Sequence, residues 1–146
     1  MSYSIHRFPL WVFAFLLLGC GDTVKHPVPY VSVNEWVYLS TPTGYPLQFI
    51  GGTVLLPDAG YKGIVVYRRT ALGDNDDFGA YDLTCPNHVS SGCGTLALVD
   101  NLYAECPCDG QQFLLYDGQA LGGSTTYPLY TYKTTYDGNA LHIKNR

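Results

Sequence analysis

Short hydrophobic runs separated by turn residues make up most of the chain. After the N-terminal segment, these runs are a few residues long and rich in β-branched and aromatic side chains, which is typical of strands. The clearest are Trp36–Ser40, Gly63–Arg68 and Thr95–Val99. No helical periodicity longer than about two turns occurs after the N-terminal segment. The pattern predicts an all-β domain of small antiparallel sheets, either a β-sandwich or a partly open barrel.

The strongest turn signal lies near the C-terminus. Asp137-Gly138-Asn139 separates a run rich in tyrosine and threonine, from Tyr127 to Tyr136, from the strand-like run Ala140–Lys144. A glycine after aspartate between two such runs is typical of a β-hairpin. The acidic run Asp74–Asp77 lacks the spacing of a calcium-binding loop, so we interpret it as a solvated turn.

Composition and charge exclude several classes of protein. Sixteen glycines, nine prolines and thirteen tyrosines, with a single methionine, argue against a helical bundle. Twelve acidic residues against eight lysines and arginines give a net charge of −4, so no basic surface is expected to bind nucleic acid. The sequence contains neither a glycine-rich phosphate loop nor a Ser-His-Asp pattern, and it therefore indicates no catalytic residue.

The N-terminal segment reads as a targeting signal. Arg7 precedes an apolar run, Phe8–Leu18, that is too short to span a bilayer comfortably. The run ends in Leu17-Leu18-Gly19-Cys20, which resembles the bacterial lipobox; this resemblance implies lipidation of Cys20 and a position in the cell envelope, outside the cytoplasm. A plain secretory signal before an incidental cysteine is the alternative. The expected organisation is a signal peptide over residues 1–19, a lipidated cysteine and tether over residues 20–34, and a domain over residues 35–146.

Four further cysteines occur in two loops of the expected domain. The loops are Cys85–Cys93 and Cys106–Gly110, each of which follows a strand-like run and contains a proline. An even number of cysteines in an exported protein suggests disulfides first and a metal second. The spacing also permits a zinc site with two thiolates, an imidazole and a carboxylate. Its ligands would be Cys85, His88, Cys106 and Asp109.

The order of motifs resembles that of a Rieske domain, which holds a 2Fe-2S cluster. The motifs are Phe78–Cys85, Cys106-Pro-Cys-Asp-Gly-Gln-Gln-Phe113, Asp117-Gly118, Tyr127-Pro-Leu and Gly138–Ile143. The resemblance extends from about Trp36 to the C-terminus. It implies a small antiparallel β-sandwich or partly open barrel in which two cysteine-bearing loops meet.

The resemblance also implies an incomplete set of cluster ligands. A Rieske cluster binds one iron through two cysteines and the other through two histidines. Cys85 and Cys106 occupy the thiolate positions, but Asn87 and Asp109 stand where the family has histidine. His88 is one residue late, so we expect it to face solvent.

The other two cysteines, Cys93 and Cys108, match a pair that forms a disulfide in the respiratory-chain branch of the family. If that disulfide forms here, Cys85 can also join Cys106, and the domain would then be held by two disulfides and no cluster. The competing arrangement keeps those two thiolates on iron, with His88 and Asp109 as substitute ligands.

Two functions are therefore expected. In the first, an envelope lipoprotein carries a cluster-free, disulfide-stapled Rieske-like domain that is a structural or interaction module for another envelope protein. In the second, a membrane-anchored electron-transfer protein carries a 2Fe-2S cluster with non-standard ligands. Zinc bound by the same residues is a third alternative. In each case the lipid anchor makes the membrane a partner.

Overall fold

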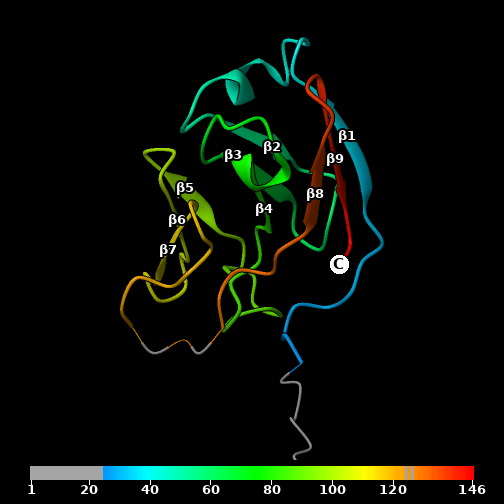
Figure 1. Cartoon of the computed structure of the whole chain (residues 1–146). Helices are drawn as coiled ribbons and strands as arrows, with labels where there is room; N and C mark the ends of the chain where they lie inside the picture. The colour runs from blue at the N-terminus through cyan, green and yellow to red at the C-terminus, as the bar shows by residue number, and fades with distance from the viewer. Residues whose placement is uncertain (1–24, 124, 126) are drawn as a thin grey trace, which may run out of the picture.

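The computed structural model describes residues 25–123, 125 and 127–146; the expected signal peptide, Cys20 and the start of the tether lie outside the described residues. Within these ranges nine strands form three antiparallel sheets (Figure 1). The first sheet has the order β1 (Asn34–Tyr38), β9 (Ala140–Lys144), β8 (Lys133–Tyr136); the second has β2 (Thr53–Leu56), β3 (Ile64–Arg68), β4 (Phe78–Asp82); the third has β5 (Ala97–Val99), β6 (Tyr103–Glu105), β7 (Gln112–Leu114). Two short 3-10 turns are η1 (Tyr45–Gln48) and η2 (Asn75–Asp77). The predicted all-β class is confirmed.

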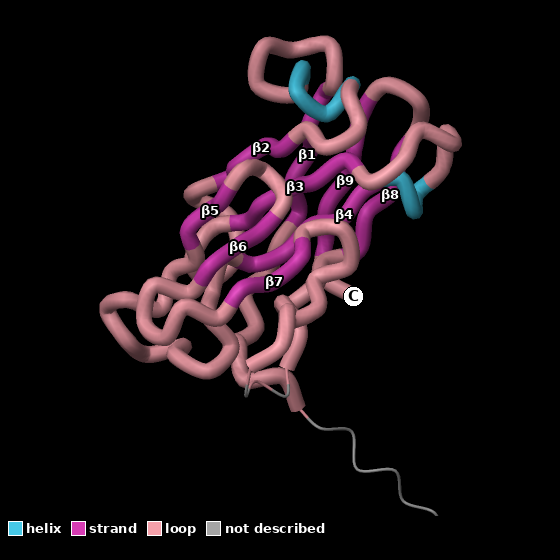
Figure 2. The backbone as a smooth tube through the Cα atoms, turned by 90° about the vertical axis from the view of Figure 1, so that its left-hand side faces the viewer, coloured by secondary structure: helices cyan, strands magenta, loops and turns pink. Residues whose placement is uncertain are grey.

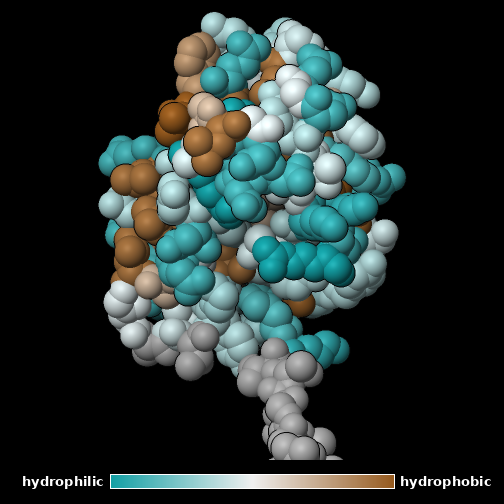
Figure 3. All heavy atoms as spheres, in the orientation of Figure 1, coloured by the Kyte–Doolittle hydropathy of each residue, from teal (hydrophilic) through white to brown (hydrophobic). Residues whose placement is uncertain are grey.

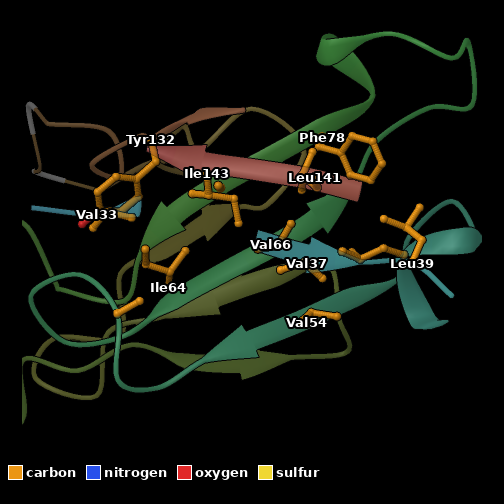
Figure 4. Close-up of a cluster of buried hydrophobic side chains, with 13 residues drawn as sticks. Val33, Val37, Leu39, Val54, Ile64, Val66, Phe78, Tyr132, Leu141 and Ile143 are labelled. Carbon is orange, nitrogen blue, oxygen red and sulfur yellow. The ribbon is translucent and has the colours of Figure 1, made fainter. Parts of the chain in front are cut away.

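The second sheet lies between the first and the third, and its strands β3 and β4 contribute side chains to the cores on both of its faces. Every residue of β3 and β4 is buried. Because side chains alternate between the two faces of a strand, Ile64 and Val66 of β3 pack into a core shared with the first sheet (Figure 4), whereas Val65 packs into a second core shared with the third sheet. A strand buried on both faces needs a continuous apolar run, which is the pattern of Gly63-Ile-Val-Val-Tyr67 in the sequence.

The predicted C-terminal hairpin is confirmed. Strands β8 and β9 pair antiparallel across the turn, and Gly138 has φ of 96°, which favours glycine. The Asp137 carboxylate accepts hydrogen bonds from the backbone N–H groups of Asn139 and Ala140, at 2.9 and 2.8 Å. Strand β2 was not predicted, because its short run follows Gly51-Gly52 and alternates poorly between buried and exposed positions.

The chain before β1 lies along the domain (Figure 1, blue). Val28 and Val33 are buried, and Nε2 of His26 lies 2.9 Å from the carbonyl oxygen of Pro128. The backbone N–H of Val33 donates to Oδ1 of Asn145 at 2.7 Å. Among the described residues, no helix has the length and apolar character needed to cross a membrane.

The acidic run before β4 is not a solvated turn throughout, because Asp77 is fully buried. Its carboxylate accepts hydrogen bonds from Thr70 Oγ1 at 2.6 Å and from the backbone N–H groups of Leu72 and Gly73, both at 2.8 Å. The Arg68 guanidinium lies 3.1 Å away and is also buried. Burial acts to raise the pKa of Asp77, but these hydrogen bonds and the charge of Arg68 outweigh it and lower the pKa.

We expect Asp77→Asn to lower stability at neutral pH by roughly 2 kcal/mol and to weaken the acid sensitivity of the fold. Since the pKa of Asp77 is lowered in the folded protein, its carboxylate favours folding above pH 3.8, and this contribution is lost as the pH falls below that value. The measurement is the thermal unfolding midpoint at neutral pH and in acid, with Asp58→Asn, at an exposed position, as the control. Equal acid sensitivity of Asp77→Asn and the parent would contradict this role.

Candidate functional site

The two cysteine-bearing loops, which follow β4 and β6, lie at the end of the molecule away from η1 (Figure 1, where the colour gives the residue number; Figure 2 shows the same loops from the side). Each loop begins with Cys-Pro and folds back on itself at once. In the loop after β4, the N–H of His88 donates to the carbonyl of Cys85 at 3.0 Å. In the loop after β6, the N–H of Gly110 donates to the carbonyl of Cys106 at 2.8 Å. Both loops are therefore tight turns, which bring the side chains at their tips close to the first cysteine of each.

Two disulfides join the loops. Cys85 is bonded to Cys106, and Cys93 is bonded to Cys108, with Cα–Cα distances of 5.6 and 5.3 Å. The first disulfide is 1% exposed at both cysteines and belongs to the second hydrophobic core. In the second disulfide, Cys93 is exposed and Cys108 is half-buried. One disulfide is thus a core element, and the other lies at the surface.

His88 and Asp109 are hydrogen-bonded to each other across the loops. Nε2 of His88 lies 2.9 Å from Oδ2 of Asp109, and each side chain is about one-third exposed. The expectation that His88 faces solvent is therefore wrong: the turn at Cys85 directs it toward the other loop. The backbone N–H of Gln111, which donates to Oδ1 at 3.0 Å, is the main cause of the lowered pKa of Asp109; burial opposes this shift, and His88 adds to it.

A possible metal centre lies at the same place. The ligand atoms of His88, Cys106 and Asp109 are all within 4.8 Å of one another, and the sulfur of Cys85 is bonded to that of Cys106. After reduction of this disulfide, the four residues would offer two thiolates, an imidazole and a carboxylate, which are ligands that zinc accepts.

The same residues do not fit a Rieske cluster. That cluster needs two thiolates and two imidazoles, whereas here both sulfurs are joined in a disulfide. At the first histidine position, Asn87 is exposed and its Oδ1 accepts a hydrogen bond from Thr125 Oγ1 at 3.0 Å. At the second, Asp109 is paired with His88. The set of side chains is one imidazole short, and its thiols are already bonded.

A buried carboxylate beneath the first loop was not predicted from the sequence. Asp82, at the end of β4, accepts hydrogen bonds from the N–H groups of Tyr61 and Lys62, at 2.7 and 3.3 Å, and from the hydroxyls of Thr84 and Tyr132. Lys62 in turn donates from Nζ to the carbonyl of Ser91 at 3.0 Å. Asp82 thereby fixes the segment that leads into Cys85. The only signal in the sequence is a polar residue within an apolar run.

Comparison with known proteins finds distant structural similarities and no similar sequence. No family model matches the sequence, and no curated protein is significantly similar to it. The structure is similar to the cyanobacterial plasma membrane Rieske protein PetC3 from Synechocystis PCC 6803, with 24% identity, a TM-score of 0.49, and coverage of 79% of this chain and 99% of that one. It is also similar to a chain of the complex of reduced oxygenase and oxidized ferredoxin in carbazole 1,9a-dioxygenase, with 20% identity, a TM-score of 0.48, and coverage of 76% and 94%.

A third similar structure is the ferredoxin of carbazole 1,9a-dioxygenase from Nocardioides aromaticivorans IC177, with 17% identity, a TM-score of 0.47, and coverage of 80% and 100%. The described domain has the features expected from the sequence: it is all-β, with three small antiparallel sheets and two cysteine-bearing loops that meet. No ligand or activity follows from these similarities for this chain.

Proposed function

We propose that the protein is an envelope lipoprotein whose Rieske-like domain lacks the iron–sulfur cluster and is a disulfide-stapled interaction module. The observation that carries this proposal is the disulfide between Cys85 and Cys106, which uses both thiols that would bind iron. The disulfide fills part of the second hydrophobic core, where its sulfur atoms are shielded from water. A cross-link at this position holds the two loops together without any metal.

The sequence before the described residues supports a membrane location. Leu17-Leu18-Gly19-Cys20 has the spacing of a lipobox, and a lipid on Cys20 would hold the domain at a membrane surface. Disulfides persist in the oxidising compartments outside the cytoplasm, so two of them in one small domain agree with export.

Exposed apolar side chains at η1 support an interaction role. Tyr45, Phe49 and Ile50 are 54%, 56% and 65% exposed, and the rings of Tyr45 and Phe49 meet edge to face with centroids 5.4 Å apart. Hydrophobic atoms are visible in this region in the space-filling view (Figure 3). A group of adjoining apolar side chains exposed to solvent is a common feature of surfaces that contact other proteins. We assign this surface to the contact with an envelope protein.

The test is a metal, sulfide and thiol analysis of the protein purified without oxygen. We expect a colourless protein with no stoichiometric iron or acid-labile sulfide, in which a thiol-alkylating reagent labels none of the four cysteines before reduction. Stoichiometric iron and sulfide, with a visible absorption spectrum, would overturn the proposal and establish the electron-transfer alternative.

Zinc binding is a second candidate function, favoured by the closeness of His88, Cys106 and Asp109. The same preparation distinguishes it. Stoichiometric zinc together with free thiols at Cys85 and Cys106 would replace the disulfide-stapled module by a zinc-binding domain. In that case Asp109→Asn would reduce zinc content, whereas Asp117→Asn, at an exposed turn outside the loops, would not.

A further inference from the structure

A pocket of about 510 Å³ opens between the segment around η2 and the start of β8. This volume lies in the range of small-molecule sites. Arg69, Lys133 and Arg146 line it, together with Asn75 and Asp76. It shares no lining residue with the two cysteine-bearing loops, so what it binds is independent of the state of the disulfides.

The charge of this pocket is opposite to that of the protein as a whole. Three of the eight lysines and arginines of the sequence line it, although the net charge of the chain is −4. Asp76 is the one acidic side chain among the described residues that line it. None of the three cations is in an ion pair in the part of the chain that the structure describes. Their charge is therefore available to an anion that enters the pocket.

Arg69 provides a second, independent observation. Its Nη2 donates to the hydroxyl of Tyr81 at 2.7 Å, which fixes the plane of the guanidinium. Its Nε is buried and has no hydrogen-bond partner among the described residues. Buried N–H groups are nearly always paired in folded proteins, so the unpaired Nε leaves the Arg69 guanidinium short of one hydrogen bond. Arginine is suited to the paired oxygens of a carboxylate or phosphate.

The backbone around Arg69 leaves room for this arrangement. A Cβ atom at Gly79 would lie 2.6 Å from the Tyr81 hydroxyl and 2.8 Å from Nη2 of Arg69. Any larger residue at position 79 would displace the pair, so the glycine is required for the guanidinium to stay where the structure has it. Arg69 is thus held in place before any ligand binds, which lowers the entropic cost of binding.

We propose that this pocket binds a small oxyanion, a carboxylate or a phosphate group, with Arg69, Lys133 and Arg146 as its cationic partners. The phosphate can belong to a free molecule or to a lipid headgroup at the membrane surface. Arg69, which lines the pocket and is held by Tyr81, supplies positive charge to the anion. Lys133 and Arg146, both exposed at the rim, supply charge that attracts the anion from solution.

The test is calorimetric titration of the full chain at neutral pH and low ionic strength with inorganic phosphate, acetate and vesicles that contain phosphatidylglycerol. We expect saturable binding of at least one probe, and the probe that binds identifies the source of the oxyanion. Lys133→Ala should weaken that binding about tenfold, because one charge-assisted contact is lost. Asp76→Asn should strengthen it, because the opposing carboxylate is removed.

The matched control is Lys25→Ala, which removes an exposed charge that does not line the pocket. All three positions are exposed, so their substitutions do not perturb the core. Absence of binding of every probe would overturn the proposal. Equal weakening by Lys133→Ala and Lys25→Ala would also overturn it, because it would show only non-specific attraction to surface charge.

Discussion

Replacement of all four described cysteines by alanine is expected to lower the free energy of unfolding by about 5 kcal/mol, enough to leave a small domain largely unfolded. Each disulfide closes a loop of the unfolded chain, and the sequence separations are 21 and 15 residues. A loop of that size corresponds to about 3 kcal/mol in the chain-entropy estimate. Because the two loops overlap in sequence, the combined effect should be less than the sum.

The two disulfides should contribute differently to the free energy of unfolding, because one is buried and the other lies at the surface. Cys85→Ala with Cys106→Ala removes a cross-link and also leaves a cavity in the second core, since both cysteines are buried. Cys93→Ala with Cys108→Ala removes a cross-link of similar loop size at the surface, and it is the matched control. We expect the first pair to be the more destabilising in denaturant unfolding followed by circular dichroism. Loss of less than about 1 kcal/mol in the first pair would contradict a stapling role.

Asp82→Ala is expected to destabilise the domain by about 4 kcal/mol, because four donors then lose a buried acceptor at once. Two of these donors belong to the turn before β3 and one is the hydroxyl of Tyr132, so the carboxylate links β4 to two separate segments. Burial and the nearby Asp82 raise the pKa of Tyr132, which keeps its phenol protonated and able to donate.

Comparison with two other variants tests this network. Tyr132→Phe removes a single donor and should cost about 1 kcal/mol, whereas Asp58→Ala, at an exposed position, should be nearly neutral. Denaturant midpoints for the three proteins provide the measurement. A similar loss in Asp82→Ala and Tyr132→Phe would show that the carboxylate serves only the tyrosine. Loss of order around Cys85 in Asp82→Ala would show, in addition, that the network positions the first loop.

Local signals in the sequence were sufficient to predict an element where a single local feature determines its structure. The continuous apolar run of β3 and the Asp-Gly turn before β9 each specify their structure within a few residues. Strand β2 has no such signal, because its pairing with β3 provides most of its stability. The buried roles of Asp77 and Asp82 depend on donors that come from other segments, so an acidic residue in the sequence could not be distinguished there from a solvated one.

The candidate site was predictable in its location and not in its contacts. The cysteine-bearing loops and their meeting follow from the resemblance to a known family, whereas the spacing of four cysteines alone permits three pairings. His88 was misplaced because its orientation was inferred from alternation along an extended chain. The backbone turns at Cys85 instead, and alternation does not apply within a turn.

The order of the disulfides along the chain bears on how the protein matures. The two disulfides interleave along the chain, because Cys93 lies between Cys85 and its partner Cys106, and the partner of Cys93 is Cys108. If the protein is exported as proposed, the chain emerges from its N-terminus, so Cys93 is the first of the three later thiols available to Cys85, and an oxidase acting at once would join these neighbours. Formation of the native disulfides would then require thiol–disulfide exchange. The native pairing would be favoured only after β4 and β6 have packed into their common core. On the proposed function, biogenesis would then need an isomerase at the site of export as well as an oxidant.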